Sequence, residues 1–204
     1  MLKDNSTEGL QNLLAERIVI LDGAMGTMIQ ELRLGEAEFR GDRFKEHQQA
    51  LKGNNDLLVI TAPEAIESIH MGFLEAGADI LETNTFNANR ISQADYGLES
   101  ICKELNTAAA ETAQRAVANW RKQTRSQRPV FIAGGMGPTN RTASLSPDVN
   151  RPGYRAIDFE SLRLAYREQA EGLAAGGVDV FLIETIFDTL NAKAGIMAVK
   201  QLEA

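Results

Sequence analysis

The sequence predicts an α/β fold of the parallel (β/α)8 or TIM-barrel type, of which this chain supplies about the first four β/α units. Short apolar runs alternate with segments of helical periodicity, which is typical of repeated β-α-β units. Each run ends in a polar, acidic or glycine-rich cluster, and the strands of a parallel barrel carry functional groups at such ends. The runs are residues 18–21 before Asp22-Gly23, 80–81 before Glu82-Thr83-Asn84, 130–133 before Gly134-Gly135, and 180–183 before Glu184-Thr185.

Four helical segments follow these runs, and each places apolar residues on one helical face. Proline is favoured at the first position of a helix, and glycine just after its end. We therefore expect helices from Pro63 to Gly77, over residues 101–120, up to Gly176-Gly177, and after Asp188 as the capping residue.

Two further patterns bear on the organisation of the chain. Residues 75–86 resemble residues 174–187, since both carry a helix-ending glycine, an aspartate, an apolar run and Glu-Thr, so the two units are expected to be equivalent. Residues 134–155 form a long segment rich in Gly, Pro, Thr, Asn and Ser. Loops of this length usually serve a site, and we expect this one over the barrel mouth, a solvated connector being the alternative.

Composition excludes several classes of protein. The 204 residues, 44% of them hydrophobic, fit one domain. A net charge of -7 gives no basic surface for nucleic acid. The single Cys102 allows no internal disulfide, and no apolar run approaches the roughly 20 residues of a membrane helix. We expect a soluble cytoplasmic protein that binds neither nucleic acid nor membrane.

A closed barrel of this type needs eight units and about 250 residues. Four units would leave two sheet edges open. We therefore expect residues 1–204 to be the N-terminal half of a larger barrel domain.

Several stretches of this chain carry a resemblance to a known family. They resemble the N-terminal homocysteine-binding domain of cobalamin-dependent methionine synthases, and the shorter motifs DGAMGT, ETNTF and IET resemble the wider family of zinc-dependent homocysteine methyltransferases. The block around Asn54-Asn55-Asp56 and the block around Asn140-Arg141-Thr142 resemble the cobalamin-dependent branch. The matching stretches are LDGAMGT (21–27), GNNDLLVITAPEAI (53–66), GADILETNTF (77–86), GPTNRTASLSPDV (137–149) and LIETIFDTLNAKA (182–194).

An amino-acid substrate presents an ammonium and a carboxylate, so its site needs anionic acceptors and N–H donors. Asp22 and Glu184, at two predicted strand ends, are suitable acceptors for the ammonium. Asp22 also matches the substrate-binding Asp-Gly of the family. A turn cap is the alternative role for Asp22, and a structural ion pair is the alternative for Glu184.

Gly23 and Gly135 let the backbone approach a ligand and offer amide N–H groups to a carboxylate. Ordinary loop conformation is the alternative. Thr83 resembles the family threonine that helps to hold homocysteine, although it also suits plain strand packing. Glu82 and Asn84 are expected to support the mouth from behind the substrate or through hydrogen bonds, and Phe86 to wall the pocket or pack in the core.

The resemblance implies methyl transfer to the thiol of L-homocysteine, giving methionine. A thiol is mostly protonated near neutral pH, and zinc stabilises the thiolate. In the family three cysteines hold the zinc, and none of them is present here, because Cys102 lies in a helical stretch. We expect no metal site and no catalytic residue in this chain, no bound cofactor, and no activity of the chain alone.

The resemblance also implies zinc and methylcobalamin in the parent protein, with folate- and cobalamin-binding domains as its partners. Three other interpretations remain open. The first is a corrin-independent methyltransferase that uses betaine or S-methylmethionine. The second is a non-catalytic amino-acid-binding half barrel. The third, a barrel lyase or aldolase, is the weakest, because no lysine stands at any of the four strand ends.

Overall fold

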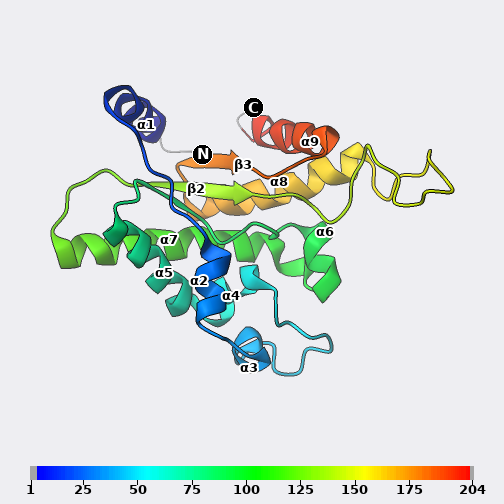
Figure 1. The fold of residues 1–204 in the computed structure, drawn as a ribbon, viewed down its shortest axis with the longest axis horizontal. Coiled ribbons are helices and arrows are strands. Elements are labelled where there is room, and N and C mark those ends of the chain that lie inside the picture. The colour runs from blue at the N-terminus through cyan, green and yellow to red at the C-terminus, as the bar shows by residue number, and fades with distance from the viewer. Residues whose placement is uncertain (1–3, 203–204) are drawn as a thin grey trace.

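The computed structural model describes residues 4–202 and has mixed α/β architecture. A parallel sheet of order β1-β2-β3 runs through the molecule, and the long helices follow one another along it in chain order (Figure 1). The strands are β1 (Ile80–Glu82), β2 (Phe131–Met136) and β3 (Val180–Ile183). The α-helices are α1 (Asp4–Glu16), α2 (Met25–Glu31), α3 (Glu36–Arg40), α4 (Leu58–Thr61), α5 (Pro63–Ala76), α6 (Arg90–Gln93), α7 (Cys102–Thr124), α8 (Phe159–Gly176) and α9 (Thr189–Lys200). Three 3-10 helices are η1 (Asn55–Leu57), η2 (Ala94–Tyr96) and η3 (Glu99–Ile101).

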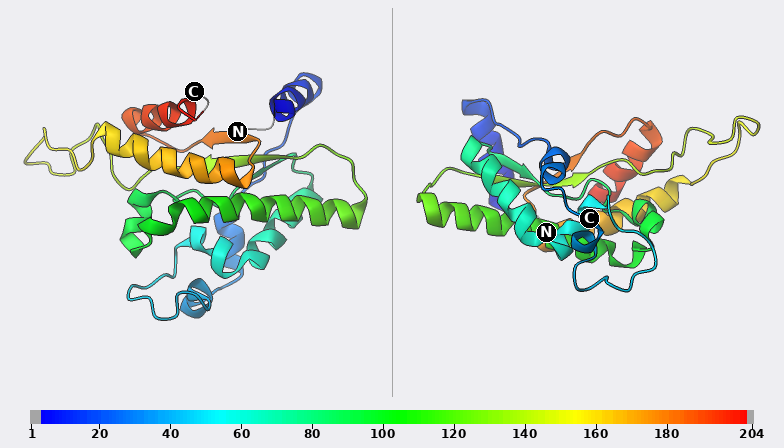
Figure 2. Two further views of the ribbon diagram at one scale, coloured as in Figure 1. Left: turned by 180° about the vertical axis from the view of Figure 1, so that it is seen from behind. Right: turned by 60° about the horizontal axis from the view of Figure 1, so that its bottom comes forward.

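The sheet has the parallel pairing that the sequence predicts. Ile80 of β1 lies opposite Phe131 of β2, and Ala133 of β2 lies opposite Val180 of β3. Helices α7 and α8 pack against each other and against β2, and the left view of Figure 2 shows them side by side on one face of the sheet. All three strands therefore end at the same edge of the sheet.

The first predicted strand, residues 18–21, is wrong as a strand. It is reduced to a single parallel bridge between Leu21 and Ile80, supported by a 2.9 Å bond from the Asp22 N–H to the Ile80 carbonyl. Within residues 4–202 no strand pairs with the outer edge of this segment, and Leu21 is 42% exposed. The Ile20 carbonyl accepts both the Asp79 and the Ile80 N–H, so the bonds of this segment do not follow the regular spacing of a ladder.

The two halves of the internal repeat make the same kind of hydrogen bond. Asp79 and Asp179 each stand just before a strand and accept a hydrogen bond from the neighbouring segment: Ile20 N to Asp79 Oδ2 at 3.0 Å, and Ile132 N to Asp179 Oδ2 at 2.8 Å. Each aspartate thus sets the register of its strand against the one before it. The two units occupy equivalent places in the fold, as the sequence predicts.

The predicted helix ends are largely confirmed. Pro63 starts α5, and Gly77 ends it with a left-handed φ of 106°. Asp188 caps α9, because its side chain accepts the Leu190 N–H at 2.9 Å. Helix α7 runs past the predicted end at residue 120, to Thr124. The helices of residues 4–61 were not predicted as elements.

The loop after β2 lies beside the start of α9, and its position over a barrel mouth stays a prediction. Ser144 N donates to Asp188 Oδ2 at 2.9 Å, which pins the first part of the loop beside the start of α9. Beyond that point the loop projects past the end of α8 (Figure 1). None of its residues lines the cavity described below. The position of the loop thus depends on contacts with α9, which is distant in the sequence.

Two main groups of buried side chains hold the layers together. One joins α2, α4 and α5 to α7 around Leu57, Leu58 and Ile66. The other joins β2, α8 and α9 around Tyr166 and Leu173. Burial of such side chains stabilises the fold by about 1.5–3 kcal/mol each. The edge of the sheet where the strands end remains open to a cavity.

No single helix within residues 4–202 is long and apolar enough to cross a membrane. The segments Asn55–Thr61 and Pro63–Ala76 meet the length and composition test only when taken together, and they are bent by 110° where they join.

Candidate functional site

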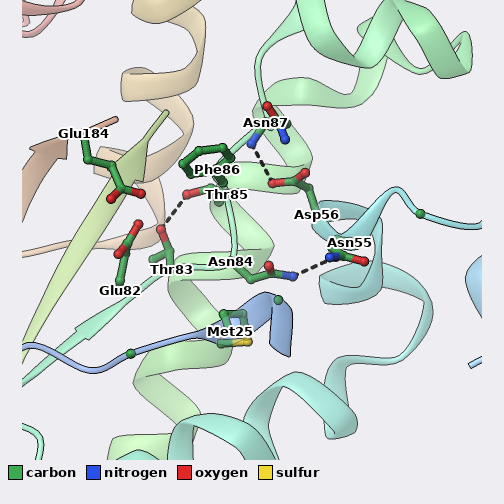
Figure 3. A pocket seen from close by; sticks show the side chains of 13 residues that line it. Met25, Asn55, Asp56, Glu82, Thr83, Asn84, Thr85, Phe86, Asn87 and Glu184 are labelled. Carbon is green, nitrogen blue, oxygen red and sulfur yellow. Dashed lines mark hydrogen bonds between the residues drawn. The ribbon is translucent and has the colours of Figure 1, made fainter. Parts of the chain in front are cut away.

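A cavity of about 330 Å³ opens at the carboxyl edge of the sheet (Figure 3). Its walls come from the ends of β1 and β3, from the turn that begins α2, and from the segment around η1. The residues that line it are Gly23, Met25, Gly26, Gly53, Asn55, Asp56, Glu82, Thr83, Asn84, Thr85, Phe86, Asn87 and Glu184. Six of the eight predicted site residues line the cavity, and the other two, Asp22 and Gly135, do not.

Asp22 lies at the base of the site. Its side chain is only 2% exposed, and both of its oxygens accept the Glu82 N–H at 3.1 Å. Burial raises the pKa of Asp22 to about 7, because the charged form loses its water, while the Glu82 N–H opposes that rise. Asp22 therefore does not cap a local turn through this bond; it ties the segment before α2 to the end of β1.

Glu82 and Glu184 point toward each other across the middle strand (Figure 3). Burial and a hydrogen bond to Glu184 raise the pKa of Glu82 to about 8. The residue between them is Gly135, where a Cβ atom would lie 2.5 Å from Glu82 Oε1. The absence of a side chain at Gly135 is what leaves room for Glu82. Glu82 therefore lies in the wall itself, beside the predicted acceptor Glu184, rather than behind it.

Gly135 does not offer a free amide to the cavity. Its N–H donates to Thr83 Oγ1 at 3.0 Å, and its carbonyl accepts from Thr85 Oγ1 at 2.7 Å. The two threonine hydroxyls lie 2.6 Å apart. Because Thr85 gives its single proton to the carbonyl, Thr83 donates to Thr85, and the three residues form a closed ring of hydrogen bonds. The ring joins the end of β1 to β2. The Thr83 hydroxyl proton is donated to Thr85 and is therefore not free for a substrate.

Asn84 and Phe86 shape the side of the cavity that faces η1. Asn84 Nδ2 donates to the Asn55 carbonyl at 2.7 Å and so ties the end of β1 to that segment. Phe86 is 36% exposed and lines the cavity, so it is a wall residue and not part of the core. The roles of Asn84 and Phe86 toward a substrate stay predictions.

Asp56 is the main wall residue that sequence reasoning missed. It is 5% exposed and accepts the Asn87 N–H at 3.0 Å. Burial raises its pKa to about 6, although the bond from Asn87 lowers it. A signal was available, because Asp56 stands in the block Asn54-Asn55-Asp56 that carries the family resemblance.

His70 lies behind the cavity. It is fully buried on α5, and its Nδ1 lies 3.9 Å from Asp22 Oδ2, too far for a direct hydrogen bond. Neither ring nitrogen has a hydrogen-bond partner among the described residues. Burial lowers the pKa of His70 to about 4, so the ring is neutral and gives Asp22 no positive charge.

A sequence profile of homocysteine S-methyltransferases matches residues 19–204 of this chain. The chain belongs to the homocysteine S-methyltransferase family. The match includes every residue of the cavity wall and the four predicted strand segments apart from Ile18.

Solved structures support the same fold for this family member. The metallated form of the homocysteine methyltransferase MmuM from Escherichia coli is 22% identical, with a TM-score of 0.73 over 95% of this chain and 63% of that chain. Its oxidized form is 21% identical, with a TM-score of 0.72 over 95% of this chain and 62% of that one. The chain thus spans less than two thirds of the length of these structures.

The residues of this family member do not fit a zinc site with thiolate ligands. Cys102 is the single cysteine, and it is buried at the start of α7. Burial raises its pKa to about 12, so its thiolate does not form near neutral pH. Within residues 4–202 no three His, Cys, Asp or Glu side chains are grouped to hold a metal ion.

Proposed function

We propose that this chain carries part of the homocysteine site of an enzyme that transfers a methyl group to the thiol of L-homocysteine, giving methionine. The single observation behind this proposal is the pair Glu82 and Glu184 in the wall of one cavity of a family member, with the Asp22 carboxylate directly behind them, where it accepts the Glu82 N–H. Such a group of carboxylates suits the ammonium end of an amino acid, since buried charges need partners. The backbone of Gly23 and Gly26, which also lines the cavity, suits its carboxylate.

We place this site in the N-terminal half, residues 1–204, of a (β/α)8 barrel. The parallel order β1-β2-β3, the helices between the strands and the likeness to MmuM support that placement. The thiol would be activated by zinc bound to residues outside this chain, because zinc stabilises a thiolate at neutral pH. The residues present here bind and orient the amino-acid end of the substrate.

For the methyl donor we propose methylcobalamin, with folate- and cobalamin-binding domains as partners in the parent protein. The blocks around Asn55 and Asn140 support this branch. The family match and the likeness to MmuM are equally consistent with a corrin-independent enzyme that takes betaine or S-methylmethionine. The donor supplied to the parent protein in an activity assay separates these two candidates.

Calorimetry with the purified chain tests the binding site. We expect L-homocysteine to bind, and 4-sulfanylbutanoic acid, which lacks the amino group, to bind at least about tenfold more weakly. Asp22→Asn and Glu184→Gln should each weaken homocysteine binding by a similar factor. Asp42→Asn is the control, because the Asp42 side chain is 96% exposed and does not line the cavity. Equal binding of both ligands would contradict the assignment.

A second assay tests whether this chain binds the substrate without catalysing the methyl transfer. We expect no methionine from homocysteine and methylcobalamin with this chain alone, because it lacks the thiol-activating residues. Methionine formation above a heat-inactivated control would overturn that part of the proposal. In the parent protein, activity with betaine or S-methylmethionine but not with methylcobalamin would favour the corrin-independent alternative.

A further inference from the structure

The cavity wall holds negative groups and no positive one. Glu82 and Glu184 face each other at the ends of β1 and β3, Asp22 lies beneath Glu82 after the first segment, and Asp56 comes from η1. The described residues that line the cavity include no lysine, arginine or histidine. Like charges this close cannot all be ionised at low cost, so the group needs a compensating positive charge.

The neighbouring elements do not supply that charge. His70, from α5, is the group packed closest behind Asp22, and its buried imidazole is neutral. Both ring nitrogens of His70 lack a partner among the described residues, which leaves a buried polar group directed at Asp22 and unsatisfied. The compensating charge therefore has to arrive from solvent, as a proton or as part of a ligand.

Gly135 makes the approach of the two glutamates possible. It lies between them on β2, opposite Leu182, and any side chain there would displace the Glu82 carboxyl group, whose Oε1 would be 2.5 Å from the new Cβ. Its backbone is held by the ring with Thr83 and Thr85. The two glutamate side chains thus face each other above Gly135, where no side chain separates them. A hydrogen bond between two carboxyl groups requires one proton.

We propose that Glu82 and Glu184 hold one proton between them in the empty site, and that the ammonium group of an α-amino acid replaces this proton when it binds. The exchange breaks no covalent bond other than the carboxyl O–H: one proton goes to solvent, and two carboxylates then face one ammonium. This inference rests on the proposed function for the identity of the ligand, but the shared proton does not depend on it. Glu82 becomes a residue that determines specificity for cationic ligands.

The raised pKa of Glu82, about 8, supports this picture, and hydrogen bonding to Glu184 is among its causes. Asp22, with a pKa of about 7, titrates nearby, so we expect the titration steps to belong to Asp22, Glu82 and Glu184 as a group. Because binding releases a proton, affinity for an amino acid should rise by up to tenfold per pH unit between about pH 6 and pH 7.5.

The ligand-free chain tests the first half. Carbon-13 NMR of glutamate side-chain carboxyls, assigned with Glu82→Gln, should show Glu82 titrating well above the ordinary range of glutamate. In Glu184→Gln its pKa should fall, because the hydrogen bond and the like charge are both lost. Glu111→Gln, at an exposed position on α7, is the matched control and should leave the titration of Glu82 unchanged. A Glu82 carboxyl that titrates between pH 4 and 5 in the unmodified chain would overturn the proposal.

Calorimetry at pH 7 in two buffers of different ionisation enthalpy tests the second half. L-Homocysteine should release close to one proton, and its affinity in Glu82→Gln should lose most of its pH dependence. Homocysteine binding without proton release would overturn this inference and leave the proposed function standing. A shared proton seen by NMR together with no homocysteine binding would overturn the proposed function and the ligand half, but not the shared proton.

Discussion

The two ends of β1 carry acidic residues in opposite circumstances. Asp79, just before the strand, is 2% exposed at its side chain and pairs with Arg17 at 2.7 Å and Arg128 at 2.9 Å. These partners hold the pKa of Asp79 well below its usual range, the bond to Arg17 being the largest cause. Glu82, at the other end, has a raised pKa and no cationic partner among residues 4–202.

The acidic residue at the amino end of β1 stabilises the fold, whereas the one at the carboxyl end belongs to the site. At the amino end, charge is compensated within the protein: Arg128 also donates to the carbonyls of Leu74 and Ala78 and lies over Trp120. At the carboxyl end, compensation is left to a ligand or a proton. Unpaired buried acids cost stability, and such groups gather at functional sites.

Removal of the charge at Asp79 should have the largest effect. Asp79→Asn leaves two arginines without their carboxylate and should lower the free energy of unfolding by about 2–4 kcal/mol. The contribution of Asp79 is present above its unfolded-state pKa and is lost as pH falls, because its folded-state pKa is lowered. Urea denaturation at pH 7 measures the loss, with Asp42→Asn as the exposed control. An equal effect of the two variants would remove the contrast between the ends of the strand.

A side chain at Gly135 should be the next most damaging change, and to binding rather than to folding. Gly135→Ala pushes Glu82 away from Glu184 and should weaken homocysteine binding by about tenfold, or 1.4 kcal/mol. Gly153→Ala is the control, because no atom lies within 4 Å of a Cβ built there. Calorimetric titration of both variants tests this, and unchanged affinity in Gly135→Ala would show that the gap is unimportant.

Glu82→Gln should stabilise the chain at alkaline pH. The folded-state pKa of Glu82, about 8, lies above its ordinary 4.5, so folded chains bind more protons and stability falls as pH rises through that range. Glutamine removes this dependence. After a discount for partial exposure we expect a gain of about 1 kcal/mol at pH 8, or roughly 2–4 °C in Tm. Thermal melts at pH 5 and pH 8 measure it, and a gain of the same size at both would refute the cause.

Arg17→Gln should have the smallest effect. The Arg17 side chain is 41% exposed, and Arg128 still pairs with Asp79 when Arg17 is lost. Its destabilisation should be well below that of Asp79→Asn and should shrink further in high salt. Urea midpoints at low and high salt test this. A loss equal to that of Asp79→Asn would mean that Arg17 alone compensates the aspartate.

Much of the fold could be predicted because its signals are local. Apolar runs mark β1, β2 and β3, Pro63 and Gly77 bound α5, and Asp188 caps α9. These features depend on periodicity and on bonds between residues a few positions apart. The grouping of polar residues at strand ends follows as well, since parallel strands end at one edge of a sheet.

The tertiary structure decided the features that depend on strand register and on contacts between distant segments. Two residues separate Asp79 from Glu82, whereas four separate Asp179 from Glu184. Only the register of β1 and β3 with β2 brings the two glutamates to either side of Gly135. The reduction of residues 18–21 to a bridge, the use of the Gly135 N–H by Thr83 and the course of the long loop are of the same kind. Each rests on contacts between residues far apart in the chain, which no local pattern of side chains encodes.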